Sequence, residues 1–134
     1  MTPFPLKIVT PDGVQYDGQA EELIVRTTTG DMGILAGHIN CVTPLGMGRA
    51  TIVMAGKRRY AACIGGMLSV LNGSITLLPT TFEWAENIDV SRAEASYDRA
   101  KQTLDNKQAS DTELRLAEAR LKRALVRKSI GSMR

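Results

Sequence analysis

Apolar residues follow two different periodicities along this chain. Up to about residue 82 they form short runs separated by glycine turns, and the run Glu22–Thr27 alternates, with Leu23 and Val25 on one face. The Asn72-Gly73 pair between two such runs is typical of a tight β-hairpin. We expect strands at 6–9, 14–16, 22–27, 40–42, 49–54, 57–62, 67–71 and 74–78. Many short strands at close spacing predict an antiparallel β-sandwich or flattened barrel.

Glycines mark where these strands turn. Of the 12 glycines, 11 precede residue 74. Residues 11–13 (Pro-Asp-Gly) form a turn signal, because proline fixes φ and glycine accepts a positive one. Gly30, Gly33 and Gly37 interrupt a short apolar segment, which indicates bends or a β-bulge. No Gly-Lys-Ser/Thr follows them, so we do not expect a phosphate-binding loop.

After residue 89 the apolar residues recur at helical spacing. Asp89 is a suitable N-cap, and we expect Arg92 to reach back to its carboxylate. The first helix should end near Asp105, and a capping box of Ser110 and Glu113 opens a second helix. The apolar stripes comprise Val90, Ala93, Tyr97, Ala100 and Leu104, then Leu114, Ala117, Leu121 and Ala124, with Leu125 beside the second stripe.

Together these patterns predict an α+β chain. Residues 1–85 form an N-terminal antiparallel β-sandwich, residues 86–134 form a C-terminal antiparallel two-helix hairpin, and 83–93 is the expected hinge and a candidate anion site. Four of the nine stripe positions are alanine. Alanine contributes about 0.8 kcal/mol or less on burial, against roughly 1.5–3 kcal/mol for leucine. The hairpin is therefore either a two-state element that docks and undocks or a permanently packed pair, and the residues leave both open.

The formal net charge of +3 is unevenly distributed. Residues 1–85 carry 6 basic and 6 acidic side chains, whereas 115–134 carry 7 basic and 1 acidic. Such a helix favours an acidic partner, a polyphosphate or a nucleic-acid backbone, although basic residues near a helix C-terminus also complement the macrodipole. Aromatic residues make up 4% of the chain, which disfavours platforms for stacking bases.

The cysteines and the hydropathy pattern bear on the compartment. Cys41 and Cys63 lie far apart in apolar segments, which favours buried thiols in a reducing compartment over a disulfide. No basic and apolar signal region precedes Lys7, and no apolar run approaches the length of a membrane span. We expect a soluble intracellular protein.

The single histidine, His38, is a weak candidate for catalysis or metal binding. Cys41 is three residues on, but no further histidine or cysteine lies near enough to complete a zinc set. No neighbouring acid or catalytic serine suggests a triad. We expect no catalytic residue, no metal site and no catalytic cofactor, with a His38-dependent hydrolase as a minor alternative.

Arginines on the helices are better candidates for binding. Arg92 and Arg99 are seven apart and Arg123 and Arg127 four apart, so each pair shares one helix face. Neither Arg99 nor Arg123 has an acid four residues away. Folding the hairpin would bring like charges together unless an anion lay between them, and guanidinium forks suit phosphate oxygens. The alternative is an ordinary exposed helix surface.

The chain resembles the epsilon subunits of F-type ATP synthases over its whole length. The matching stretches are 9–13 (Val-Thr-Pro-Asp-Gly), 30–38 (Gly-Asp-Met-Gly-Ile-Leu-Ala-Gly-His), Gly65-Gly66 before 68–70 (Leu-Ser-Val), 75–78 (Ile-Thr-Leu-Leu) and 86–93 (Glu-Asn-Ile-Asp-Val-Ser-Arg-Ala). Ala36 and Asn40 stand where the family commonly has proline. Each stretch is short, and their order and spacing together make the resemblance specific.

The resemblance implies a non-catalytic rotor subunit that couples proton transport to ATP synthesis. Its sandwich would bind the gamma subunit and the c-subunit ring, with Asp31 and the residues through His38 forming a loop that faces the ring. Its hairpin would permit ATP hydrolysis when folded and inhibit it when extended toward the alpha and beta catalytic subunits. The protein would lie peripherally on the cytoplasmic face of a bacterial plasma membrane.

Some bacterial members of the family bind ATP through an Ile-Asp-x-x-Arg-Ala motif, which residues 88–93 match. The resemblance implies that Glu83, Ile88, Asp89 and Ala93 hold the adenosine and that Arg92, Arg99, Arg123 and Arg127 hold the phosphates. ATP would then be a regulatory ligand. A basic helical hairpin that binds nucleic acid is the alternative.

Overall fold

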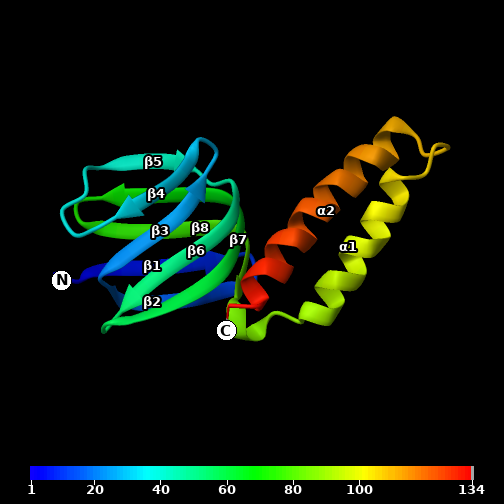
Figure 1. The fold of residues 1–134 in the computed structure, drawn as a ribbon. Helices are drawn as coiled ribbons and strands as arrows, with labels where there is room; N and C mark the ends of the chain where they lie inside the picture. The colour runs from blue at the N-terminus through cyan, green and yellow to red at the C-terminus, as the bar shows by residue number, and fades with distance from the viewer. Residues whose placement is uncertain (134) are drawn as a thin grey trace. The chain divides into compact units, whose positions relative to one another are not determined.

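The computed structural model describes residues 1–133, which form an eight-stranded sheet followed by two helices (Figure 1). The chain divides into two compact units, one of residues Met1–Trp84 and one that begins at Ala85. The strands are β1 (Phe4–Thr10), β2 (Gly13–Ala20), β3 (Glu22–Thr27), β4 (Gly30–Ile34), β5 (Cys41–Pro44), β6 (Met47–Met54), β7 (Lys57–Leu71) and β8 (Ser74–Trp84). A short 3₁₀ helix η1 (Ala85–Asn87) precedes α1 (Val90–Leu104) and α2 (Asp111–Gly131).

The sheet confirms the predicted sandwich class. Its order is β2-β1-β8-β7-β6-β3-β4, and β5 pairs with β7 away from this path. All pairs are antiparallel except β1 and β8, which run parallel with Leu6 opposite Ile75. The parallel pair joins the first and last strands of the unit. Because those strands are remote in sequence, no turn signal could have revealed their pairing.

Strand β7 is continuous where the sequence predicts two strands, 57–62 and 67–71, and that prediction is wrong. Gly65 and Gly66 have φ of +68° and +96°, so the chain bends there without leaving the sheet. Leu45 N donates to Gly66 O at 2.8 Å and Gly65 N to Gly46 O at 2.9 Å, which carries the hydrogen bonding through the bend. A bent β7 pairs with β5, β6 and β8.

Alternation along the strands builds a largely aliphatic core. In β1, Phe4, Leu6 and Ile8 are buried while Pro5 and Lys7 are exposed. Two rings join this core at the end of β8, where Phe82 and Trp84 pack edge to face at 4.9 Å. The remaining core residues are Ala20, Leu23, Val25, Ile34, Leu45, Ala50, Ile52, Ala61, Cys63, Leu68, Val70, Ile75 and Leu77.

Both helix starts follow the capping signals. The Asp89 carboxylate accepts from Arg92 N at 3.0 Å. That bond caps α1, whereas the predicted side-chain ion pair of Asp89 with Arg92 does not form among the described residues. Ser110 and Glu113 form the predicted capping box, and α1 ends at Leu104 as expected. None of the helices in residues 1–133 combines the length and apolar character needed to cross a membrane.

The hairpin seam is made of small residues. Ala93 and Ala100 of α1 and Ala117 and Ala124 of α2 are buried, while the larger stripe residues remain partly or largely exposed. Gly131 completes the seam, because a Cβ on it would lie 2.7 Å from Val90 Cγ2 and 3.1 Å from Ile88 Cγ2. Small residues allow the two backbones to approach closely, but they bury little apolar area.

Candidate anion-binding groove on the helical hairpin

A groove of about 640 Å³ lies between α1 and α2. This volume is within the range of sites that hold a small ligand. From α1 the groove is lined by Ser96, Arg99, Ala100 and Thr103, and from α2 by Glu113, Leu116, Ala117, Arg120, Arg123, Ala124 and Arg127. The buried alanines form the floor, since Ala100, Ala117 and Ala124 are 5% exposed or less.

Positive charge dominates this groove. Among the described residues, four guanidinium groups line it against one carboxylate, that of Glu113. Glu113 Oε1 already accepts from Ser110 Oγ at 3.1 Å and from Ser110 N at 3.4 Å, because it belongs to the capping box. The groove is therefore suited to an anion with several oxygens, for which arginine forks are the common receptors.

Local hydrogen bonds orient the α1 side of the groove. Arg99 Nη2 donates to Ser96 Oγ at 3.1 Å, one turn earlier on the same helix. Thr103 Oγ1 donates to Arg99 O at 3.2 Å. Across the hairpin, the Lys128 ammonium lies 5.5 Å from the centroid of the Tyr97 ring, a cation–π contact between the helices.

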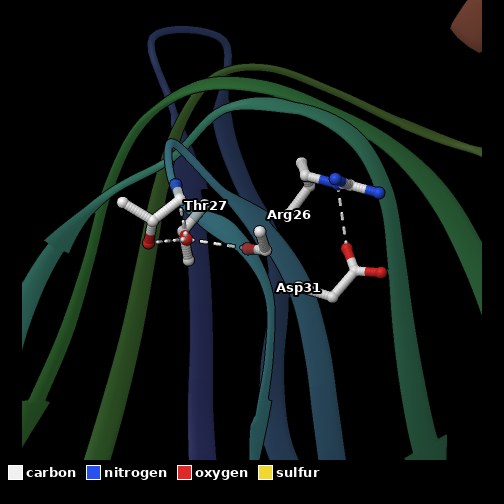
Figure 2. A network of polar contacts seen from close by, with 5 residues as sticks. Arg26, Thr27 and Asp31 are labelled. Carbon is white, nitrogen blue, oxygen red and sulfur yellow. Dashed lines mark hydrogen bonds and ion pairs between the residues drawn. The ribbon is translucent and has the colours of Figure 1, made fainter.

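A second polar cluster lies at the β3–β4 turn (Figure 2). Arg26 and Asp31 are cross-strand partners, and Arg26 Nε lies 3.0 Å from Asp31 Oδ1. Thr27 is buried, and its hydroxyl donates to Gly30 O at 2.7 Å and accepts from Thr29 N at 3.2 Å. These bonds hold the turn in a defined shape, while the ion pair remains about half exposed.

Comparison with known proteins decides the family. Residues 3–85 match the family model described as ATP synthase, Delta/Epsilon chain, beta-sandwich domain, and residues 86–129 match the one described as ATP synthase, Delta/Epsilon chain, long alpha-helix domain. The chain belongs to the ATP synthase delta/epsilon family. It is 40% identical to the ATP synthase epsilon chain of Bacillus cytotoxicus, with all of both chains covered. It is 42% identical to that of Caldanaerobacter subterraneus, with 96% of this chain and 94% of the relative covered.

Solved structures share the fold of this delta/epsilon chain. A chain of the Euglena gracilis mitochondrial ATP synthase, solved as OSCP/F1/c-ring, matches with a TM-score of 0.85 at 19% identity, covering 100% of this chain and 83% of that one. A chain from the central stalk and c-ring of the Tetrahymena thermophila mitochondrial ATP synthase matches with a TM-score of 0.63 at 12% identity, with 95% of each chain covered. The comparisons lend no support to a nucleic-acid-binding module or a hydrolase.

The groove of this delta/epsilon chain gathers part of the predicted ATP set. Arg99, Arg123 and Arg127 line it together, and Arg120 joins them although the sequence analysis missed it. The signal for Arg120 was present, because it lies three residues before Arg123 and seven before Arg127, on the same helix face. Spacing alone could therefore have found it.

The other predicted ATP residues do not line the groove. Ile88 and Ala93 are buried at 1% and 0% exposure, and the Asp89 carboxylate caps α1. Arg92 lies in the first turn of α1, whereas the α1 side of the groove begins at Ser96. Glu83 belongs to β8 of the first unit, opposite Ala62.

The predicted loop from Asp31 to His38 is not one loop. Gly30–Ile34 is strand β4, so Asp31 lies near its start and His38 lies beyond its end. The sequence prediction, which placed no strand at 30–34, is wrong there, since alternation with glycine still allows β pairing. His38 Nδ1 lies 2.8 Å from Ile39 O, a contact within its own turn. No group of three or more potential metal ligands gathers within residues 1–133.

Proposed function

We propose that this chain is the epsilon subunit of a bacterial F-type ATP synthase, a non-catalytic component of its central stalk. The observation that carries the proposal is end-to-end similarity at about 40% identity to chains named ATP synthase epsilon chain. As such a subunit it binds the gamma subunit and the c ring and helps couple proton transport to ATP synthesis. It then lies peripherally on the cytoplasmic face of the plasma membrane.

In this proposal the sandwich contacts the c ring through Asp31 and His38. The Arg26–Asp31 pair presents one charge of each sign on a turn held by Thr27, which suits a polar partner surface. Because both side chains of the pair are about half exposed, a partner can hydrogen bond to either without breaking the pair.

The hairpin is the regulatory element. Its seam of small residues supports a folded state of modest stability, so that α1 and α2 can separate and extend. The extended form inserts the basic α2 against acidic surfaces of the alpha and beta subunits and inhibits hydrolysis. Binding of an anion to the folded form relieves the inhibition, because a ligand favours the state for which it has the higher affinity.

ATP is the proposed regulatory ligand. Arg99, Arg123 and Arg127 bind its phosphates in the groove, with Arg92 at the start of α1. Glu83, Ile88, Asp89 and Ala93 contact the adenosine, as the family motif implies. Of these, Ile88 and Ala93 are buried, so they offer the adenosine backbone atoms or apolar surface that small movements expose.

Calorimetric titration of the full chain with ATP tests this assignment. Arg99→Ala should weaken ATP binding by about 1.5–3 kcal/mol, the contribution of a hydrogen bond to a charged group. That corresponds to a roughly 10- to 150-fold higher Kd. Arg115→Ala is the matched control, since Arg115 is exposed on α2 and does not line the groove. Absence of heat at millimolar ATP would remove the sensor role and leave the stalk role standing.

A further inference from the structure

Arg120 is the arginine of the groove that lies outside the ATP-binding set implied by the family resemblance. It lies on the same face of α2 as Arg123 and Arg127, and Arg120 and Arg127 are seven residues apart, or about 10 Å along the helix at a rise of 1.5 Å per residue. Arg99 contributes a fourth guanidinium from α1. The four groups form a row long enough to contact a chain of phosphates rather than a single one.

Arg120 forms no ion pair with any of the described residues. The residues three and four away from it are Leu116, Ala117, Arg123 and Ala124, none of them acidic. The ion pair of Lys122 with Glu118 on the same helix, at 3.3 Å, does not involve Arg120. A guanidinium in this position gains from an anion in the groove, because it does not have to give up an existing partner.

The rest of the lining has little with which to recognise a base. Apart from charged groups it consists of the hydroxyls of Ser96 and Thr103, three alanine methyl groups and Leu116. Among the described lining residues there is no aromatic ring to stack on a purine and no amide side chain to read its edge. The chemistry of this groove is therefore that of a phosphate receptor.

We propose that the groove recognises the triphosphate chain itself, and that Arg120 is the residue that makes it prefer a triphosphate to a diphosphate. This proposal deepens the proposed function and rests on it in one respect, namely that ATP is the natural ligand that carries the triphosphate. In it Arg99, Arg123 and Arg127 bind two phosphates, and Arg120, nearer the turn between the helices, binds the third. Inorganic tripolyphosphate, which has no nucleoside, binds in the same place.

The test is calorimetry on the full chain at constant ionic strength in metal-free buffer, with tripolyphosphate, pyrophosphate, ATP and ADP. For the unmodified chain we expect tripolyphosphate to bind at least 10-fold more tightly than pyrophosphate. Arg120→Ala should weaken tripolyphosphate and ATP binding about 10-fold or more and change pyrophosphate and ADP binding less than 3-fold. Arg120→Lys keeps the charge but loses the guanidinium fork, so its affinity for tripolyphosphate should lie between those of the unmodified chain and Arg120→Ala.

Arg115→Ala is the matched control and should leave all four affinities unchanged, since it removes the same charge from the same helix outside the groove. Far-ultraviolet circular dichroism confirms that each variant keeps its helices. Equal losses for tripolyphosphate and pyrophosphate in Arg120→Ala, or the same loss in Arg115→Ala, would overturn the role of Arg120. Binding of ATP without binding of tripolyphosphate overturns this inference alone, whereas binding of tripolyphosphate without ATP overturns the nucleotide sensor alone.

Discussion

Gly66 shows how a single position can fix the shape of the sandwich. Its φ is +96°, and a Cβ there would overlap the Leu78 carbonyl oxygen and lie 2.7 Å from Pro79 Cα. Both obstacles are backbone atoms of β8, which cannot rotate away as a side chain can. The bend in β7 and the pairing of β7 with β8 therefore depend on glycine at this position.

Gly66→Ala should lower the free energy of unfolding by about 3 kcal/mol or more, because backbone strain and steric overlap add. Urea unfolding followed by the fluorescence of Trp84 measures this change within the sandwich. Gly73→Ala is the control: its φ of +84° carries similar strain, but a Cβ there meets nothing within 4 Å. It should cost about 1–2 kcal/mol. Equal losses in the two variants would contradict a role for the close approach of β8.

Cys63 is a second residue with a distinct physical consequence. Burial raises the pKa of its thiol from 9.0 to about 12, since the thiolate would lose its hydration in the core. The folded state thus holds the Cys63 proton over a pH range in which the unfolded chain releases it. Stability is unaffected by this group below about pH 9 and falls as pH rises from about 9 to 12.

The free energy of unfolding should therefore fall more steeply above pH 9 in the unmodified chain than in Cys63→Ala. The difference in slope should approach about 1.4 kcal/mol per pH unit, the limit for one proton. Comparing slopes cancels the lysines and tyrosines that titrate in both proteins, and also the constant cost of the smaller side chain. Parallel pH profiles would show that the Cys63 thiol ionises normally.

At the scale of elements, the hairpin is defined by the small residues on its seam. Gly131 is the most restrictive of them, because a Cβ there would contact Val90 and Ile88 at the start of the hairpin. Replacing it separates the end of α2 from the beginning of α1 without touching the arginines of the groove. The variant therefore changes the docking of the helices and leaves the groove arginines unsubstituted.

Gly131→Leu should speed amide hydrogen exchange along α2 by about 10-fold or more and should weaken ATP binding by the same factor by which the folded fraction falls. Ser129→Leu is the control, since Ser129 is exposed in the same helical turn and receives the same side chain. Unchanged exchange in Gly131→Leu would show that the hairpin accommodates a larger residue and is not held by its seam.

The sequence predicts the boundaries of the helices better than it predicts the course of strand β7. Asp89, Ser110 and Glu113 predict both helix starts because caps are local interactions. The continuity of β7 could not be predicted, since Gly65 and Gly66 are as typical of a turn as of a bend and the partner strand decides between them. The spacing of the arginines predicts that Arg99, Arg123 and Arg127 meet. It does not predict that Arg92 lies outside the groove, because that depends on how the two antiparallel helices align.

Asn40 illustrates a substitution whose role only the structure explains. It stands where the resemblance leads one to expect proline, which would limit the backbone directly. Here its side-chain oxygen accepts from Asn72 N at 2.7 Å, and its amide nitrogen donates to Asn72 Oδ1 at 3.3 Å. These two bonds tie the loop before β5 to the turn before β8. Hydrogen bonds thus replace a conformational restriction that proline would supply.

At the scale of the whole molecule, the two units allow assembly and regulation to be separated. Unit Met1–Trp84 has its own core and needs no residue of the hairpin to complete its sheet. A protein truncated after Ala85 should therefore fold and still join the stalk. It should lose the element that we propose inhibits hydrolysis.

ATP synthase reconstituted with the truncated chain should hydrolyse ATP several-fold faster at low nucleotide concentration than the enzyme with the full chain. The two should converge at high nucleotide concentration, where in our proposal ATP favours the folded hairpin. Co-purification of the truncated chain with the gamma subunit and c ring is the control for assembly. Equal hydrolysis rates over the whole concentration range would contradict an inhibitory hairpin.

Strand β7 has a mechanical consequence for the central-stalk role that we propose. Its 15 residues run through the bend at Gly65 and Gly66 and are hydrogen bonded to neighbours on both sides. A force applied to either end of such a strand must shear many ladder bonds at once instead of unzipping them singly. We therefore expect the sandwich to resist deformation and to transmit torque as one rigid body.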